Sequence, residues 1–296
     1  GRNLTISGEL DAATGDFSGD VDIDGTLETD AITLGGASFI KVEGTDFTGS
    51  LLVGHSTTGT LDAAQYNTGV GLTALDALTT GDNNTTLGYG AGSAITTASS
   101  CVFIGSGAGD AITGASDNVA VGAGALSGVG TASSSAYNVA VGKDAMNVSN
   151  GARFNVAIGK DAGRTITAGD YNIVIGAEAA ENLTSGQGNV IIGANVDVSS
   201  ATGDRELIIH GNSGDDQTTW IQGDSSGNIT MPAELAAVSL DISGAIDVDG
   251  TTNLDTVDID GAVQIDATFT SGVDGQGYDT KFFGDTASAY ILWDTS

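Results

Sequence analysis

The sequence predicts an all-β protein: a trimeric parallel β-roll, or β-solenoid, of about nine 17-residue coils, flanked by slender β shaft segments. Three observations lead to this fold class. A five-residue motif recurs at a fixed interval, a column of alanines keeps the same interval, and glycine is abundant (46 residues) beside a single proline. A 17-residue unit is too short for a pair of helices, and its β-branched residues favour a strand closed by a turn.

The recurring motif is Asn-φ-x-φ-Gly, where φ is an apolar residue. NVAVG at 118–122 and NIVIG at 172–176 are clear copies, and SLLVG at 50–54 is the first of the looser ones. The final glycines are 17 residues apart, except for one interval of 20 whose extra residues fall in the stretch 127–136, where we expect a loop to leave the coil. Asn begins seven copies: Asn67, Asn84, Asn118, Asn138, Asn155, Asn172 and Asn189. Glycine ends all nine: Gly54, Gly71, Gly88, Gly105, Gly122, Gly142, Gly159, Gly176 and Gly193.

Each column of the repeat has a structural role. Stacked Asn side chains predict a ladder at the turn, and glycine in every copy predicts a backbone corner that has a positive φ or no room for a Cβ. The alanine column follows each glycine by three residues, from Ala74 to Ala179, and Thr57 and Val196 replace it at the two ends, as suits capping coils. Because stacked strands lie about 4.8 Å apart, nine coils predict a rod of roughly 40 Å.

Strand alternation divides each motif between two faces. The third position after Asn is always Val, Leu or Ile, from Val53 to Ile192, so the first and third positions are expected to face the interior of the coil. The middle position, from Leu52 to Ile191, then faces outward and never carries a charge. A coil this thin cannot bury both faces, so we expect the middle residues to pack on other copies in an obligate homotrimer. The alternative is a monomer with a flat, aggregation-prone apolar side.

Five segments follow from these patterns. Residues 1–49 are expected to form an N-terminal β shaft, 50–200 the β-roll, 201–235 a small β adaptor, 236–275 shaft repeats, and 276–296 the start of a further module. The shafts are recognised by short alternating strands that end in glycine, such as VDIDG at 21–25 and 257–261. In the adaptor, Ile208, Trp220 and Ile221 are expected to supply most of the bulk.

Charge and composition limit the partners. The chain has 8 basic and 38 acidic residues, a formal net charge of −30, so we expect it to bind no nucleic acid and to avoid anionic lipid. It has no apolar run long enough for a membrane-spanning helix, so no membrane insertion is expected.

Its one cysteine, Cys101, stands in the Asn column and excludes an intramolecular disulfide framework. Because the chain begins at Gly1 without a leader, we expect a processed chain or a fragment.

The repeat resembles a known family. Its Asn ladder, glycine corner and alanine column over residues 50–200 are similar to the parallel β-roll of trimeric autotransporter adhesin heads, and more closely to the head-like repeats of bacteriophage tail fibres. The segments DGTTNLD at 249–255, WIQGDSSGNIT at 220–230 and FFGDTASAYILWD at 282–294 also look like phage fibre modules. Two features depart from the autotransporter adhesins, since the 17-residue period is longer than theirs and no membrane barrel is visible.

The resemblance implies a homotrimeric fibre at the virion surface, or at least outside the cell. Its partners would be other virion fibre or baseplate proteins and a host surface receptor, for which a glycan is one candidate. We therefore expect a structural phage tail or head fibre that projects a host-recognition surface and catalyses nothing. A bacterial surface adhesin or extracellular filament subunit is the first alternative, and a polysaccharide-degrading tailspike is the second.

Few residues qualify as chemical sites. Four aromatic residues directly precede the Asn column, so they would align on one edge of the stacked coils, either facing a receptor or covering the end of the core: Tyr66, Tyr137, Phe154 and Tyr171. Asp20, Asp22 and Asp24 resemble the first half of a calcium loop, but Ala31 stands where its final Glu would be. No cofactor is expected beyond weak divalent cation binding by Asp residues, and no metal ligand set is assigned.

Overall fold

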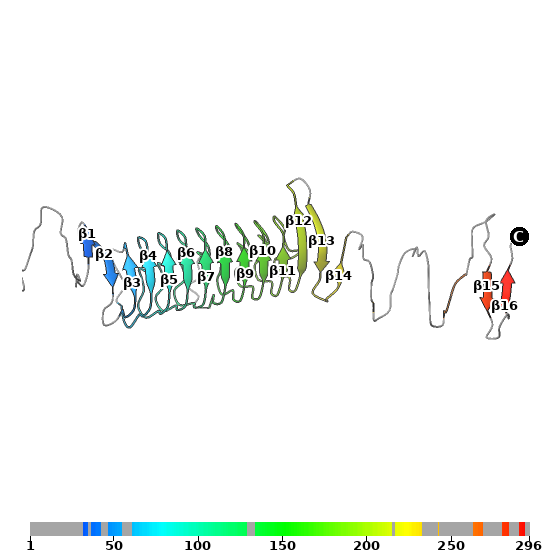
Figure 1. Cartoon of the computed structure of the whole chain (residues 1–296), viewed down its shortest axis with the longest axis horizontal. Coiled ribbons are helices and arrows are strands. Elements are labelled where there is room, and N and C mark those ends of the chain that lie inside the picture. The colour runs from blue at the N-terminus through cyan, green and yellow to red at the C-terminus, as the bar shows by residue number, and fades with distance from the viewer. Residues whose placement is uncertain are drawn as a thin grey trace, which may run out of the picture. The chain divides into compact units, whose positions relative to one another are not determined.

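The computed structural model describes residues 32–34, 37–42, 47–54, 61–128, 134–214, 217–232, 242, 263–268, 280–283 and 290–293. These residues form strands and turns, and no helix occurs among them. The chain divides into two compact units, residues 1–236 and 237–296. The first unit holds one long sheet and the second holds a separate hairpin (Figure 1). The all-β solenoid predicted from the repeat is thereby confirmed.

The long sheet contains fourteen strands that pair in sequence order, from β1 to β14. Nine consecutive three-residue strands, β3 to β11, are the coils of the solenoid. They span Leu51–Val53, Thr68–Val70, Thr85–Leu87, Val102–Ile104, Val119–Val121, Val139–Val141, Val156–Ile158, Ile173–Ile175 and Val190–Ile192. Neighbours among these nine are parallel and in register, so each repeat position stacks on the same position of the next coil.

The longer interval in the repeat leaves the stacking intact. Val119 of β7 still pairs with Val139 of β8, twenty residues later, in the same register as the other coils. The extra residues therefore leave the coil within the segment between the two strands, as the spacing of the glycines predicts. Residues 129–133 of that segment lie outside the described residues.

Antiparallel strands cover both ends of the stacked coils. At one end β1 (Ile32–Leu34) and β2 (Ala37–Val42) form a hairpin, and β2 pairs antiparallel with β3. At the other end β12 (Leu207–Asn212) continues the parallel stack, and β13 (Gln217–Gly223) and β14 (Ile229–Thr230) follow antiparallel (Figure 1). Regular parallel edges would be templates for further strand addition, and these end strands cover them.

Most of the predicted shaft and C-terminal segments lies outside the described residues. The described parts of 1–49 are the hairpin β1–β2 and the turn that leads to β3. In the second unit, β15 (Thr280–Phe283) and β16 (Tyr290–Trp293) pair as an antiparallel hairpin. In the expected adaptor, Ile208 is buried, whereas Trp220 is 57% exposed, so the prediction that Trp220 supplies core bulk is wrong. Its ring lies over Gly211, where a Cβ would come within 2.5 Å of it.

The predicted assignment of the two strand faces is also wrong. The middle residues, including Leu52, Phe103 and Ile191, are fully buried inside the coil, and the first and third residues lie on the outside. The outward side chains remain partly exposed, with Leu87 at 49% and Ile158 at 39%. The prediction placed the invariant Val, Leu or Ile of the third position inside, but the narrow coil buries the middle column, which is mostly small residues such as Gly69, Thr86 and Ala140. Leu and Ile side chains from the turns fill the remaining interior: Leu75, Leu78, Ile95, Ile112, Leu126, Ile166 and Leu183.

Candidate functional site

The asparagine column forms an internal ladder that is interrupted at Cys101. All seven side chains are fully buried. In the pair Asn67 and Asn84, the side-chain oxygen of the first accepts both the backbone N–H and the side-chain N–H of the second, each at 3.0 Å. The Asn84 side chain also donates to the carbonyl of Ala98 at 2.9 Å. Each rung therefore ties two coils together through groups that would otherwise be buried without partners.

The ladder has a start, an end and one interruption. Ser50 starts it by accepting the backbone N–H of Asn67, and Glu206 ends it by donating its own backbone N–H to Asn189. Cys101 interrupts it, because its thiol makes only weak contacts with the carbonyls of Ser99 and Ala115 and offers no amide oxygen to the next coil. Burial raises the pKa of the Cys101 thiol to about 11. A buried thiol of this kind is an inert structural group.

The glycine column forms the backbone corner that the sequence predicts. From Gly71 to Gly193 these residues adopt φ values between 132° and 148°. A Cβ on Gly71 would come within 2.3 Å of the carbonyl oxygen of Gly88 in the next coil, and the later glycines repeat this approach. Both backbone conformation and space therefore require glycine there. Gly54 differs, because its φ is 80° and its closest backbone neighbour would be 3.6 Å away.

The aromatic residues before the Asn column are brought together in part. Three of them stack face to face, with ring centroids 4.9 Å apart between Tyr137 and Phe154 and 5.0 Å apart between Phe154 and Tyr171. Tyr66 lies outside this stack and covers Gly49. Every residue of this column, from Gly49 to Arg205, has a left-handed φ near 60°, which turns the side chain outward at the bend before the strand.

These rings are surface groups and not a cover for the core. Phe154, between the other two rings, is 39% exposed, whereas Tyr137 and Tyr171 are 52% and 59% exposed. Stacking uses the ring faces, so the solvent-facing parts of the stack are chiefly ring edges and tyrosine hydroxyls. That these residues face a receptor stays a prediction.

The outer strand face is an extended apolar feature of the described surface. It comprises the first and third residues of β3–β11, all of which are Val, Ile or Leu except Thr68 and Thr85. Parallel register aligns them into two continuous rows along the nine coils. No charged side chain belongs to either row. Sequence reasoning found this apolar alternation but assigned it to the interior.

Basic residues of the coils gather beside part of this face. Lys143, Arg153, Lys160 and Arg164 fall in consecutive coils, and each has an acidic neighbour. Arg153 donates to Asp170 of the next coil at 2.9 Å, and Lys160 contacts Glu178 at 2.6 Å. These acids raise the pKa of both bases. Because the cations are exposed, the pairs contribute little to stability, but they neutralise this stretch of a strongly acidic chain.

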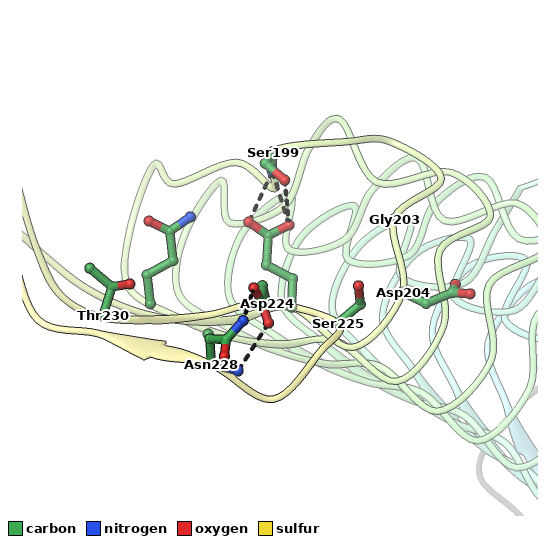
Figure 2. Close-up of a pocket in the computed structure, with 10 residues that line it drawn as sticks. Ser199, Gly203, Asp204, Asp224, Ser225, Asn228 and Thr230 are labelled. Carbon is green, nitrogen blue, oxygen red and sulfur yellow. Dashed lines mark hydrogen bonds between the residues drawn. The ribbon is translucent and has the colours of Figure 1, made fainter. Parts of the chain in front are cut away.

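A polar cavity of about 390 Å³ opens where the last coil meets the end strands (Figure 2). On its coil side, the buried carboxylate of Glu206 accepts the backbone N–H of Ser199 at 3.0 Å and its hydroxyl at 3.2 Å. On the strand side, the Asp224 carboxylate accepts hydrogen bonds from the backbone N–H and the side-chain amide of Asn228 and from the backbone N–H of Ser226. These bonds lower the pKa of Asp224. The carboxylates thus stabilise the turns that close the solenoid.

The predicted weak metal binding has no preformed cluster in the described part of the chain. No three His, Cys, Asp or Glu side chains of the described residues gather closely enough to hold a metal ion. Asp20, Asp22, Asp24 and Ala31 lie outside those residues, as does His55. Among the described segments, no helix is long and apolar enough to cross a membrane. The alignment of the aromatic residues on one edge was predicted and is confirmed for Tyr137, Phe154 and Tyr171. The sequence analysis missed the ion pairs between coils, although the 17-residue spacing of Arg153 and Asp170 was a usable signal.

Comparisons with known protein families, with curated proteins and with solved structures each gave no match.

Proposed function

We propose that this chain is a structural fibre protein of a virion, a homotrimer without catalytic activity that projects a host-recognition surface. The observation that carries the proposal is the outer strand face, two uncharged rows on the outside of β3–β11 that are apolar except for Thr68 and Thr85. Soluble monomers rarely expose apolar surface that is both continuous and extended, and such a face marks a contact with another molecule. A second and third copy of the same chain present the complementary surface at the same repeat.

The rest of the described architecture suits a rigid, extended role. Stacked coils make contacts only with their neighbours, and in-register backbone pairing and the Asn ladder connect each coil to the next. The antiparallel end strands stop the stack from adding further strands. Three copies side by side would give stiffness, and three equivalent recognition surfaces would give avidity without any chemistry. The virion assignment rests on the resemblance of the repeat and its flanks to phage fibres.

The assembly is tested by light scattering after size exclusion, with and without EDTA. About three times the chain mass of 29.2 kDa is the expected result. Ile158→Asp, on the part of the outer face that β9 contributes, should dissociate the trimer, whereas Thr97→Asp, at an exposed position between β5 and β6, should not. A wild-type chain that remains a monomer would overturn the homotrimer. Dissociation by EDTA alone would show that metal ions between carboxylates of different copies hold the trimer together.

The location is tested by labelling. Antibodies raised against the recombinant solenoid are applied to virions and to cells from the source culture, and bound gold is counted by electron microscopy. Label on the appendages of virions is expected. Label on bacterial surfaces without virions would reject the virion role and support the adhesin alternative.

A further inference from the structure

Two columns of residues border the outer strand face on its opposite edges. One is the aromatic edge, the column directly before the Asn ladder: Tyr66, Asn83, Ser100, Asp117, Tyr137, Phe154, Tyr171 and Gly188. The other is the lysine edge, the column directly after the glycine corner: Leu72, Tyr89, Ser106, Ala123, Lys143, Lys160, Ala177 and Ala194. One coil contributes one residue to each edge, six positions apart, with the strand between them.

The two edges match in most of the coils, although Asn83 shares its coil with Tyr89 and Tyr171 shares its coil with Ala177. The lysine edge holds the only two lysines of the described coils, and they share coils with stacked rings: Tyr137 and Lys143 flank β8, and Phe154 and Lys160 flank β9. In the coils of β6 and β7 both edges carry small or short side chains instead, such as Ser100 with Ser106. In the coil of β4, both edges are apolar and exposed, with Tyr66 at 59% and Leu72 at 52%.

We propose that copies of the chain associate parallel and in register, with the aromatic edge of each copy against the lysine edge of the next. This proposal rests on the homotrimer proposed above. When copies are related by a rotation axis parallel to the coil stack, equivalent coils lie at one height and opposite edges meet around the ring. Tyr137 then faces Lys143 of the neighbouring copy, and Phe154 faces its Lys160. An antiparallel pair would place like edges together, and so would lose this match.

The chemistry of the two edges supports their contact. The rings present edges and hydroxyls to the outside, and the long apolar stem of a lysine can cover such surface while its ammonium group stays solvated. In this chain both ammonium groups already form salt bridges within their own copy. Lys143 pairs with Asp144, and Lys160 pairs with Asp161 and Glu178. Tyr137 also offers a hydroxyl oxygen that can accept a hydrogen bond from an ammonium group.

The distribution of charge along the chain explains why the proposed contact between edges lies at the coils of β8 and β9. Copies that each carry a formal charge of −30 repel one another, and between 61 and 128 the chain has acidic residues but no basic one. The basic residues Lys143, Arg153, Lys160 and Arg164 occur where the rings stack. Two acidic copies can therefore approach each other most closely in this neutralised stretch.

Engineered disulfides test the arrangement in the full chain. The double variant Phe154→Cys with Lys160→Cys pairs the edges of one coil level, and Phe154→Cys with Lys143→Cys is the matched control, one coil out of register. Tyr137→Cys with Lys143→Cys is a second in-register pair, used if the first variant fails to assemble when reduced. The native Cys101 is fully buried, and the unmodified chain under the same oxidation shows whether it contributes. The products are read on a denaturing gel without reductant.

A covalent trimer from the in-register pair, with little cross-linking of the shifted control, is expected, because a closed ring of three joins every chain to the next. A covalent dimer that does not convert to trimer on longer oxidation, from a variant that light scattering finds at twice the chain mass, would show a parallel two-fold assembly instead of a trimer. If light scattering finds trimers of the reduced variants and yet neither in-register pair cross-links, or if the shifted control cross-links equally, the edge arrangement is wrong while the homotrimer stands. A monomeric wild-type chain would instead remove the proposed assembly itself.

Discussion

The ring of Phe103 occupies the space that Gly109 leaves free, six residues later in the same coil. A Cβ on Gly109 would lie 2.4 Å from the Phe103 ring. In some other coils the sizes are reversed, and a small middle residue is followed six positions later by a large one, as Gly69 with Leu75 and Ala140 with Met146 show. Thr86 and Ala157 are followed six positions later by glycines, Gly92 and Gly163, and there the side chains of Ile95 and Ile166 would lie 2.9 and 2.7 Å from an added Cβ. Large side chains from either the strand or the turn therefore fill the narrow interior of each of these coils.

This pairing predicts that Gly109→Ala destabilises the protein more than Gly107→Ala does. Both glycines have left-handed φ values, 60° and 66°, so both substitutions carry the same backbone penalty of about 1 kcal/mol. Only Gly109→Ala also forces the added methyl group into the Phe103 ring. This overlap should lower the free energy of unfolding by about 1–3 kcal/mol more. At Gly107 the nearest atom is the flexible Asp110 carboxylate at 3.3 Å. Urea unfolding of both variants measures the difference, and equal losses would refute the volume pairing.

Cys101→Asn should stabilise the protein by completing the ladder. The new side chain can accept the backbone and side-chain N–H groups of Asn118 and donate to the carbonyl of Ala115, as its counterparts in other coils do. With a net value of about 1 kcal/mol per buried hydrogen bond, we expect a rise in the thermal midpoint of about 2–4 °C. Cys101→Ala is the control that removes the thiol without adding a rung. A Cys101→Asn midpoint at or below that of Cys101→Ala would contradict the prediction.

The buried Cys101 thiol should make stability fall in alkaline solution. Its pKa is raised from 9.0 to about 11, so between these values the unfolded chain loses the thiol proton while the folded chain keeps it. The contribution is therefore fully present below pH 9 and is lost as the pH rises through 11, by about 2–3 kcal/mol. Unfolding free energies from pH 8 to 11 are compared with those of Cys101→Ala, which lacks this titration. Parallel pH profiles of the two proteins would exclude the effect.

Thr86→Val should raise stability, because the Thr86 hydroxyl is buried in the core without a hydrogen-bond partner. Replacing it by a methyl group removes the desolvation cost of that hydroxyl, about 1–2 kcal/mol. Thr85→Val, at the exposed first position of the same strand, is the matched control and should change stability by less than about 0.5 kcal/mol. Chemical unfolding reports both, and a loss of stability in Thr86→Val would indicate that the hydroxyl has a partner in solution.

The sequence by itself determined the period, the number of coils and the corner glycines. These features follow from local rules, since only glycine tolerates the backbone at Gly88 and the Asn-φ-x-φ-Gly motif closes a short strand with a turn. Parallel, in-register stacking then repeats each position in every coil, so a pattern of nine copies defines the sheet. The interval of 20 residues could be interpreted in the same way, because an insertion that preserves the columns must leave the coil.

Only the tertiary structure decided which face of the strand is inside. Alternation separates Val139 and Val141 from Ala140 but does not tell which set is buried, and hydrophobicity alone favours the two valines. The decision comes from the rest of the coil, where Met146 and the ladder residue Asn138 occupy the interior and leave room for alanine only. Asn138 and Ala140 have the same parity, so a buried ladder places the middle residue inside. The valines then form the outer face, whose partners lie beyond a single chain.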